Sequence, residues 1–273
     1  MSLLPALNAA PDLQPLTDGL RHPKFWTSVH AAEYLLDLDL APAAVDAFVA
    51  RKRQCEAVPV ERIGLWRVMA LRAQGTPEYA RLLDRIRRIA FAVPPTADQT
   101  HAVETLLKLQ YKCTPSEAAR LRRILRASDS AVGLQIYSAA LLALADPTAL
   151  SDLERLLERH RQDPLWCGVL LYALRLVPNL SERLYVQAQA FCRTSPSEEN
   201  RMAAALLLLN HRRLTYAQLP RPPREPGKDA LAVLLLYAPQ SPEFRRMLGQ
   251  MRRSDNAEWR LFAAYAALQA GAH

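Results

Sequence analysis

Prolines recur along the chain at intervals of about 31–38 residues, and an apolar pattern with helical spacing follows each of them. Proline is favoured at the first position of an α-helix, where its missing N–H has no bond to lose. Internal periods of about 20–50 residues are typical of stacked structural repeats. The chain is therefore predicted to be a series of similar units, with helices opening at Pro42, Pro77, Pro115, Pro147, Pro178 and Pro242 and a last gap of about two periods.

A second helix is predicted to follow each proline-led helix. Ser, Thr or Asp stands at most of these openings, where its side-chain oxygen can accept a hydrogen bond from a first-turn N–H group. A short helix near residues 12–20 and a long helix after Pro23 precede the series. We therefore predict an all-α fold of about seven to eight helical pairs, whose second helices open at residues 58–59, 96–98, 128–129, 163–164, 195–196 and 254–255.

The second helices share an Ala/Leu-rich middle, at residues 138–142, 171–174, 203–206 and 262–268. Together with the Asp-Pro and Ser-Asp openings, this pattern resembles HEAT-like repeats of the bacterial short-repeat kind, across roughly residues 15–271. The resemblance implies a right-handed α-solenoid, a single domain over residues 1–273, with a concave groove lined by the second helices. HEAT-like proteins include lyases and cyclases, and others that grip DNA and excise damaged bases. The resemblance therefore predicts the fold and leaves the function open.

Two stretches depart from the repeat. Residues 1–15 contain three prolines and little periodicity, and we expect a loose N-terminal lead-in. Residues 215–228 form a Pro/Arg-rich insertion, whose prolines exclude a helix over residues 219–227. This segment is interpreted as an exposed replacement for the first helix of one repeat, as a plain linker, or as a docking segment for a protein partner.

The formal charge of +8 and the pI of about 9.6 favour acidic partners. The arginine clusters fall mostly on the proline-led helices, which we expect on the outer side. This placement disfavours nucleic acid held along the concave surface, although it does not exclude it. The expected partners are an anionic small molecule or an acidic protein.

The compartment is predicted from three features. The four cysteines are widely separated and form no ligand-like pair, as expected for buried thiols in a reducing compartment. The apolar run at residues 230–238 is too short to span a membrane. No basic region precedes the first apolar residues, so we expect no signal peptide and a cytoplasmic protein without membrane contact.

A His-x-x-Glu motif occurs twice, as His30 with Glu33 and as His101 with Glu104. The copies lie about two repeat periods apart. On a helical wheel His30 and Glu33 share a polar stripe opposite an apolar face, and His101 and Glu104 share another with Thr105. Residues at i and i+3 are neighbours on a helix, and a carboxylate can orient an imidazole for proton transfer. Solvated polar faces in duplicated repeats would produce the same pattern.

The two motifs cannot share one metal ion, because helices two repeats apart are separated by roughly 20 Å. Each motif offers two ligands, whereas a catalytic zinc takes three from the protein. We therefore predict neither a metal site nor a cofactor. A ligand spanning the two motifs would lie over the intervening helix, which carries Trp66 and Arg67. Trp66 would stack on the ligand, or Arg67 would bind its anionic group through paired N–H donors. Alternatively, Trp66 is a core residue and Arg67 lies at the flank of the helix, and neither binds a ligand.

Further residues are predicted to line the binding surface. Trp66 or Arg67 would form its floor, Asp37 would lie one turn beyond the first motif, and Lys108 one turn beyond the second. Tyr137 would lie at the far side, unless it occupies a core position. The predicted function is a small-molecule enzyme or binding protein that acts on an anionic substrate by cofactor-free acid–base chemistry. Elimination, isomerisation or cyclisation would suit His30, Glu33, His101 and Glu104. A protein-interaction scaffold and a DNA-binding, base-excising protein are the alternatives.

Overall fold

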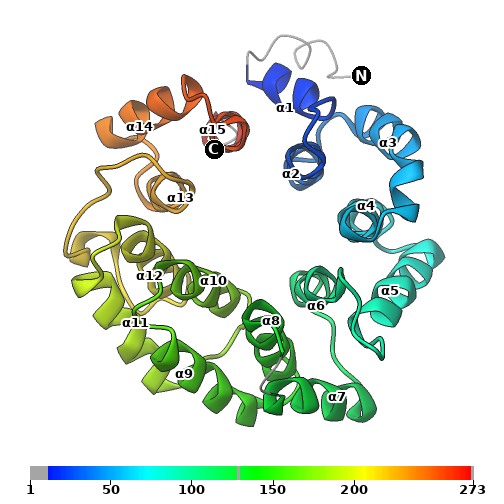
Figure 1. Cartoon of the computed structure of the whole chain (residues 1–273). Coiled ribbons are helices and arrows are strands. Elements are labelled where there is room, and N and C mark those ends of the chain that lie inside the picture. Colours follow the sequence, from blue (N-terminus) through cyan, green and yellow to red (C-terminus); the bar gives the residue numbers. More distant parts are fainter. Residues whose placement is uncertain (1–11, 128–129, 272–273) are drawn as a thin grey trace. The chain divides into compact units, whose positions relative to one another are not determined.

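The computed structural model describes residues 12–127 and 130–271, and within these ranges the chain forms helices and no strand. This confirms the all-α prediction. The helices follow in the order shown in Figure 1: α1 (Leu13–Gly19), α2 (Phe25–Asp37), α3 (Pro42–Arg51), α4 (Pro59–Arg72), α5 (Pro77–Ala90), α6 (Gln99–Lys108), α7 (Pro115–Arg126), α8 (Val132–Ala143), α9 (Leu150–Arg159), α10 (Pro164–Arg175), α11 (Glu182–Thr194), α12 (Glu198–Asn210), α13 (Lys228–Tyr237), α14 (Pro242–Arg252) and α15 (Ala257–Gly271). Short 3-10 turns lie at Arg53–Ala57 (η2), Pro147–Ala149 (η3) and Tyr216–Gln218 (η4).

The proline-led openings are confirmed with one exception. Helices α3, α5, α7 and α14 begin at the expected prolines, and Pro147 begins the 3-10 turn that leads into α9. Pro178 does not begin a helix, because α11 starts four positions later, at Glu182. The Ser181 hydroxyl accepts a hydrogen bond from the Leu184 backbone N–H at 3.2 Å, so a serine cap rather than a proline sets this start.

The packing of the helices divides the chain into two compact units. Unit 1 comprises residues 1–82 and 224–273, and unit 2 comprises residues 83–223. In unit 2 the even-numbered helices stack in sequence, with contacts between α6 and α8, α8 and α10, and α10 and α12. The odd-numbered helices pair with them, α7 and α9 with α8, and α11 with α12. This is the packing pattern of stacked helical pairs.

Unit 1 is built from both ends of the described chain. Helix α2 packs against α4 on one side and against α15 on the other, and α15 also contacts α1, α13 and α14. In an open array of repeats each repeat touches only its neighbours. The contacts of α15 with α1 and α2 therefore lie outside what the repeat pattern predicts.

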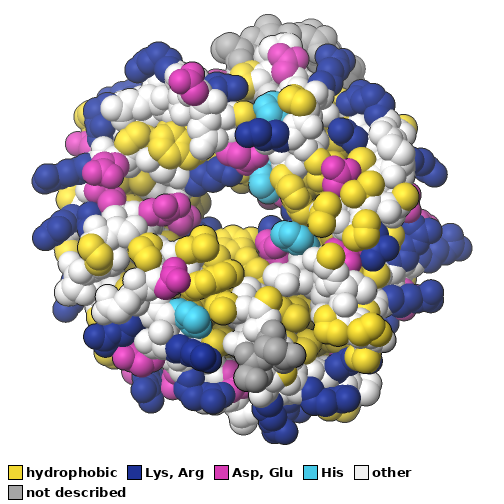
Figure 2. Space-filling view, viewed as in Figure 1, with side chains coloured by type: hydrophobic (Ala, Val, Ile, Leu, Met, Phe, Trp, Pro, Cys, Tyr) yellow, Lys and Arg dark blue, Asp and Glu magenta, His cyan; other side chains and the backbone are white. Residues whose placement is uncertain are grey.

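The arginines predicted to cluster on the proline-led helices do so. Lys and Arg side chains gather over α5, α7 and α9, as Figure 2 shows. Basic residues stand in the last turn of each of these helices, where cations offset the helix dipole. In unit 2 the even-numbered helices carry most of the core instead, and most residues of α8 and α12 are buried.

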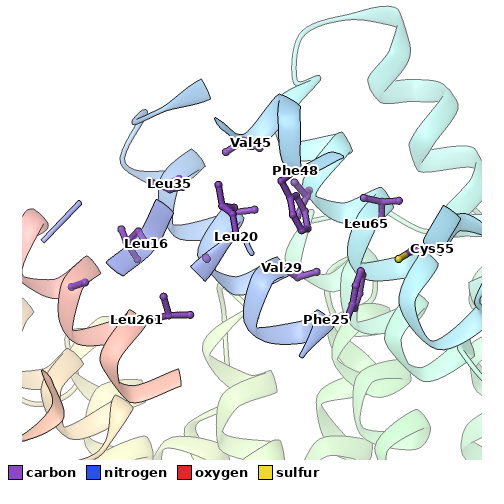
Figure 3. Close-up of a cluster of buried hydrophobic side chains, with 14 residues drawn as sticks. Leu16, Leu20, Phe25, Val29, Leu35, Val45, Phe48, Cys55, Leu65 and Leu261 are labelled. Carbon is purple, nitrogen blue, oxygen red and sulfur yellow. The ribbon is translucent and has the colours of Figure 1, made fainter. Parts of the chain in front are cut away.

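A hydrophobic cluster joins five helices of unit 1. Leu16 of α1, Leu35 of α2, Phe48 of α3, Leu65 of α4 and Leu261 of α15 are all buried in it. Figure 3 shows the cluster extending from Leu16 and Leu261 at one end to Phe48 and Leu65 at the other. The cluster holds α2 between α4 and α15. Helix α2 carries the first His-x-x-Glu motif.

The insertion at residues 219–227 is non-helical, as predicted, and follows η4. Arg221 and Pro222 in it are exposed, while Pro223 is buried. Most of the predicted N-terminal lead-in, residues 1–11, and the predicted cap at residues 128–129 lie outside the described residues. Among the helices that are described, none has the length and apolarity needed to cross a membrane.

Candidate functional site

The polar and apolar faces of α2 are as the helical wheel predicts. Val29, Ala32 and Leu35 are fully buried, whereas His30 and Glu33 are half-buried. This arrangement leaves part of each side chain of the first motif open to solvent. The partners of these two side chains differ from the predicted ones.

His30 is held by a carboxylate from the last helix. Its Nδ1 lies 2.7 Å from Glu258 Oε2, in the first turn of α15. Lys228 Nζ, from the first turn of α13, donates to the same oxygen at 2.9 Å. The side chains of His30 and Lys228 remain 31% and 36% exposed. Three helices thus contribute one residue each to a His30–Glu258–Lys228 cluster.

Glu258 is an ionised carboxylate in this cluster. Burial alone would raise the pKa of its carboxyl group, but hydrogen bonds with His30, Lys228 and Thr27 and the attraction of His30 together hold that pKa well below its ordinary value of 4.5. A carboxylate on Nδ1 orients the imidazole and leaves Nε2 as its second nitrogen. Among the residues that the structure describes, no hydrogen bond to His30 Nε2 is formed.

Glu33, the predicted partner of His30, binds Arg67 of α4. The Arg67 Nε donates to Glu33 Oε1, and the guanidinium lies over the Trp26 ring, 5.8 Å from its centroid. Arg67 is only 2% exposed, so this pair is largely removed from water. An arginine so buried and already bound to a carboxylate offers little to an incoming anion.

Trp66 lies on another side of α4 from Arg67. Its indole Nε1 donates to Glu56 Oε2 of η2 at 3.2 Å, and the Arg62 guanidinium lies 5.7 Å from the ring centroid. Trp66 is also buried. Of the two residues that the sequence could not separate, Arg67 is therefore the one that reaches the motif-bearing helix. The ligand-binding roles of both residues stay predictions.

The second motif forms the predicted pair within one helix. His101 Nδ1 lies 3.5 Å from Glu104 Oε2, and Lys108 Nζ lies 2.9 Å from Glu104 Oε1. Lys108 also lies over the Tyr172 ring of α10, 5.6 Å from its centroid. Each unit therefore contains a carboxylate that bridges a histidine and a lysine.

Thr105 was expected on the polar face of this helix but is fully buried. The helix α6 packs against α8, which covers a wider arc of its surface than an isolated amphipathic helix would hide. The prediction for this residue is wrong, whereas the apolar positions Ala102, Val103 and Leu106 are buried as expected.

Asp37 and Tyr137 have different surroundings. Asp37 accepts hydrogen bonds from the Tyr265 hydroxyl at 2.6 Å and from Gln269 Nε2 at 3.3 Å, both of α15. Tyr34 stacks on Tyr265 with ring centroids 4.6 Å apart. Asp37 thus fastens α15 to α2. Tyr137 lies half-buried on α8 in unit 2.

A cavity of about 520 Å³ in unit 1 lies beside the His30–Glu258–Lys228 cluster. Thr27, which shares a hydrogen bond with Glu258, and Ala257, which precedes it, are part of its wall. The rest of the wall comes from α1 and the residues that flank it, from the end of α14 and from α15, and it includes Asp18, Arg252 and Arg260. His30 is not one of the lining residues, so the cavity and the exposed edge of His30 are separate surfaces.

The sequence did not reveal Glu258 or Lys228. Both lie roughly 200 residues or more from His30, and neither belongs to a local motif. They reach His30 only because α15 packs against α2. The two motif copies belong to different units, and the predicted hollow shared by them stays a prediction.

The described residues contain no group of three or more His, Cys, Asp or Glu side chains placed to bind a metal ion. The four cysteines are free, and three of them, Cys55, Cys167 and Cys192, are buried. Burial raises the pKa of the Cys167 thiol to about 11, which disfavours the reactive thiolate. Comparison of the chain with protein-family models, with curated proteins and with solved structures finds no match.

Proposed function

We propose that unit 1 binds a small anionic molecule at the His30–Glu258–Lys228 cluster and moves a proton on it by cofactor-free acid–base chemistry. One observation supports this proposal above the others: His30 Nδ1 and Lys228 Nζ contact the same oxygen of Glu258. The imidazole and the ammonium group are therefore next to each other, and both are partly exposed.

Lys228 and His30 each keep hydrogen-bond donors or acceptors that Glu258 does not occupy, and these suit two different roles. An ammonium group has three N–H donors, and Lys228 uses one of them for Glu258, which leaves donors for an anionic group of a ligand. His30 Nε2 can take or give a proton while Glu258 stabilises the imidazolium that forms. Lys228 thus replaces Arg67 as the anion-holding residue, and Glu258 replaces Glu33 as the orienting carboxylate.

The chemistry suited to this pair is abstraction and return of a proton near a carboxylate or phosphate group, as in elimination, isomerisation or ring closure. We further infer that the chain is a HEAT-like solenoid, a group that includes lyases and cyclases, and that it works in a reducing, cytoplasmic compartment. The stacked helical pairs and the free, mostly buried cysteines support these two inferences.

The test uses two substitutions that separate the roles. With mono- and dicarboxylates and phosphate esters as probes, histidine NMR signals are followed during titration and each binding probe is assayed for turnover. Lys228→Gln should weaken binding about tenfold, because it removes one charge-assisted hydrogen bond. His30→Gln should lower kcat about 100-fold or more with little change in binding.

Lys24→Gln is the matched control, since Lys24 is an exposed lysine at the start of α2 that lies outside the cluster. It should change neither binding nor turnover. The proposal fails if no probe perturbs the His30 signals. It also fails if both cluster variants lose their cooperative unfolding transition, because the cluster would then be structural.

A protein-interaction scaffold is the second candidate. The observation that favours it is the non-helical Pro/Arg segment at residues 219–227, in which Arg221 and Pro222 are exposed. An exposed proline-rich segment can dock in an aromatic-lined groove of a partner. Stable co-purification of one protein that is lost when residues 219–222 are replaced by Gly and Ser would favour this candidate.

A further inference from the structure

Unit 2 contains a cavity of about 400 Å³ between the end of α7, the start of α8 and helix α9. Three arginines, Arg126, Arg155 and Arg159, and one aspartate, Asp152, are part of its wall. Leu125 and Leu156 supply apolar surface. Its volume is in the range of small-molecule sites, about 300–1,000 Å³.

The wall carries an excess of positive charge. Asp152 pairs with Arg155, three positions later on α9. Arg126 and Arg159 form no salt bridge with any residue that the structure describes. Among the wall residues that the structure describes, three guanidinium groups against one carboxylate leave an excess of two positive charges.

Helix geometry explains why the three side chains meet. Arg155 and Arg159 are four residues apart on α9, so they share one face of that helix. Arg126 is the last residue of α7, and α7 and α9 both pack on α8. Gln135 of α8 also lines the cavity, and its Nε2 donates to the Ala127 carbonyl at 3.0 Å.

We propose that this arginine cavity, defined by Arg126, Arg155 and Arg159, binds the phosphate or pyrophosphate group of a small molecule. Guanidinium groups bind phosphate oxygens through paired N–H donors, and several of them can surround one anion. The two apolar residues can contact the carbon skeleton that carries the phosphate. This site lies in unit 2 and is independent of the cluster proposed in unit 1.

The arrangement fits a small ligand better than a nucleic acid. A nucleic-acid surface places cations in a row, so that successive phosphates each meet one. Here the three arginines line one open hollow instead of forming a row. Arg123 of α7, exposed and likewise without a salt bridge among the described residues, lies outside the cavity wall.

Calorimetric titration with inorganic pyrophosphate at low ionic strength tests the proposal on the full chain. Arg126→Gln and Arg159→Gln should each weaken binding about tenfold or more, because each removes a charge-assisted contact. Arg123→Gln, on the same helix as Arg126, should leave the affinity unchanged. All three positions are exposed, so thermal unfolding of each variant should match that of the unsubstituted protein.

Three results would overturn the proposal. Pyrophosphate and inorganic phosphate could both fail to bind. The three substitutions could weaken binding equally, which would indicate general attraction to a basic surface. A duplex DNA fragment could bind more tightly than pyrophosphate and depend on Arg123 as strongly as on Arg126, which would identify a nucleic-acid surface instead.

Discussion

Glu258 is the residue on which the proposed site of unit 1 depends, because it connects His30 and Lys228 to α15. Its carboxylate is more stable in the folded chain than in the unfolded chain, as the lowered pKa of its carboxyl group shows. Glu258 therefore links the site to the pH dependence of folding.

The sign of this link follows from the direction of the pKa shift. The stability that Glu258 contributes is fully present above its unfolded pKa of about 4.5 and is lost as the pH falls through the lower, folded value. Urea denaturation of the unsubstituted protein should therefore give a lower midpoint at pH 3 than at pH 6. Glu258→Gln should reduce that difference, and at pH 6 it should cost about 1–3 kcal/mol. An acid dependence unchanged in this variant would contradict the assignment.

At the residue scale, the helical period predicted the pair within the second motif but not the burial of Thr105. His101 and Glu104 form the expected pair, because both belong to α6. His30 and Glu33 each take a partner from another helix, Glu258 and Arg67. A helical wheel contains no information about which distant helix packs against a given face.

At the scale of helices, α15 departs most from what the sequence predicted. Proline and cap residues predicted the start of most helices, because these signals act within a few residues of chain. The contacts of α15 with α1 and α2 depend on interlocking side chains instead. Gly19 of α1 is at the centre of this packing, since it lies close to Leu261 of α15 and Ala31 of α2.

A methyl group at Gly19 should therefore separate α1 from its two neighbours. A Cβ there would lie 2.6 Å from Leu261 Cδ2 and 2.9 Å from Ala31 Cβ. The leucine methyl can move, but the Ala31 Cβ is fixed to the backbone of α2. Gly19→Ala should therefore destabilise the protein by about 1–2 kcal/mol, even though alanine is the better helix former.

Gly271→Ala is the matched control for this substitution in urea denaturation. Gly271 is also helical, and apart from its chain neighbours and its own helix backbone no atom of the described residues lies within 4 Å of a Cβ built there. This variant should be as stable as the unsubstituted protein or slightly more so. If Gly19→Ala left the stability unchanged as well, α1 would not pack as closely against α2 and α15 as described.

At the scale of the whole chain, the period of about 35 residues predicted the all-α class and the pairing of helices. It did not predict that the chain would divide into a continuous unit 2 and a unit 1 assembled from both ends. A repeat period describes neighbours in sequence, whereas unit 1 is completed by residues far apart in sequence. The sequence predicts one domain over residues 1–273, and in that case the two units should unfold together.

Hydrogen exchange after a cavity-forming substitution in α15 answers that question. Leu261 is buried in the unit 1 core, so Leu261→Ala should cost about 2–5 kcal/mol. If unit 1 opens by itself, amides of α1 and α2 should exchange faster while those of α10 and α12 stay protected. Leu170→Ala, at a fully buried position of α10, should give the reverse pattern. Equal acceleration in both units, for either variant, would instead show one cooperative domain, as the repeat pattern predicts.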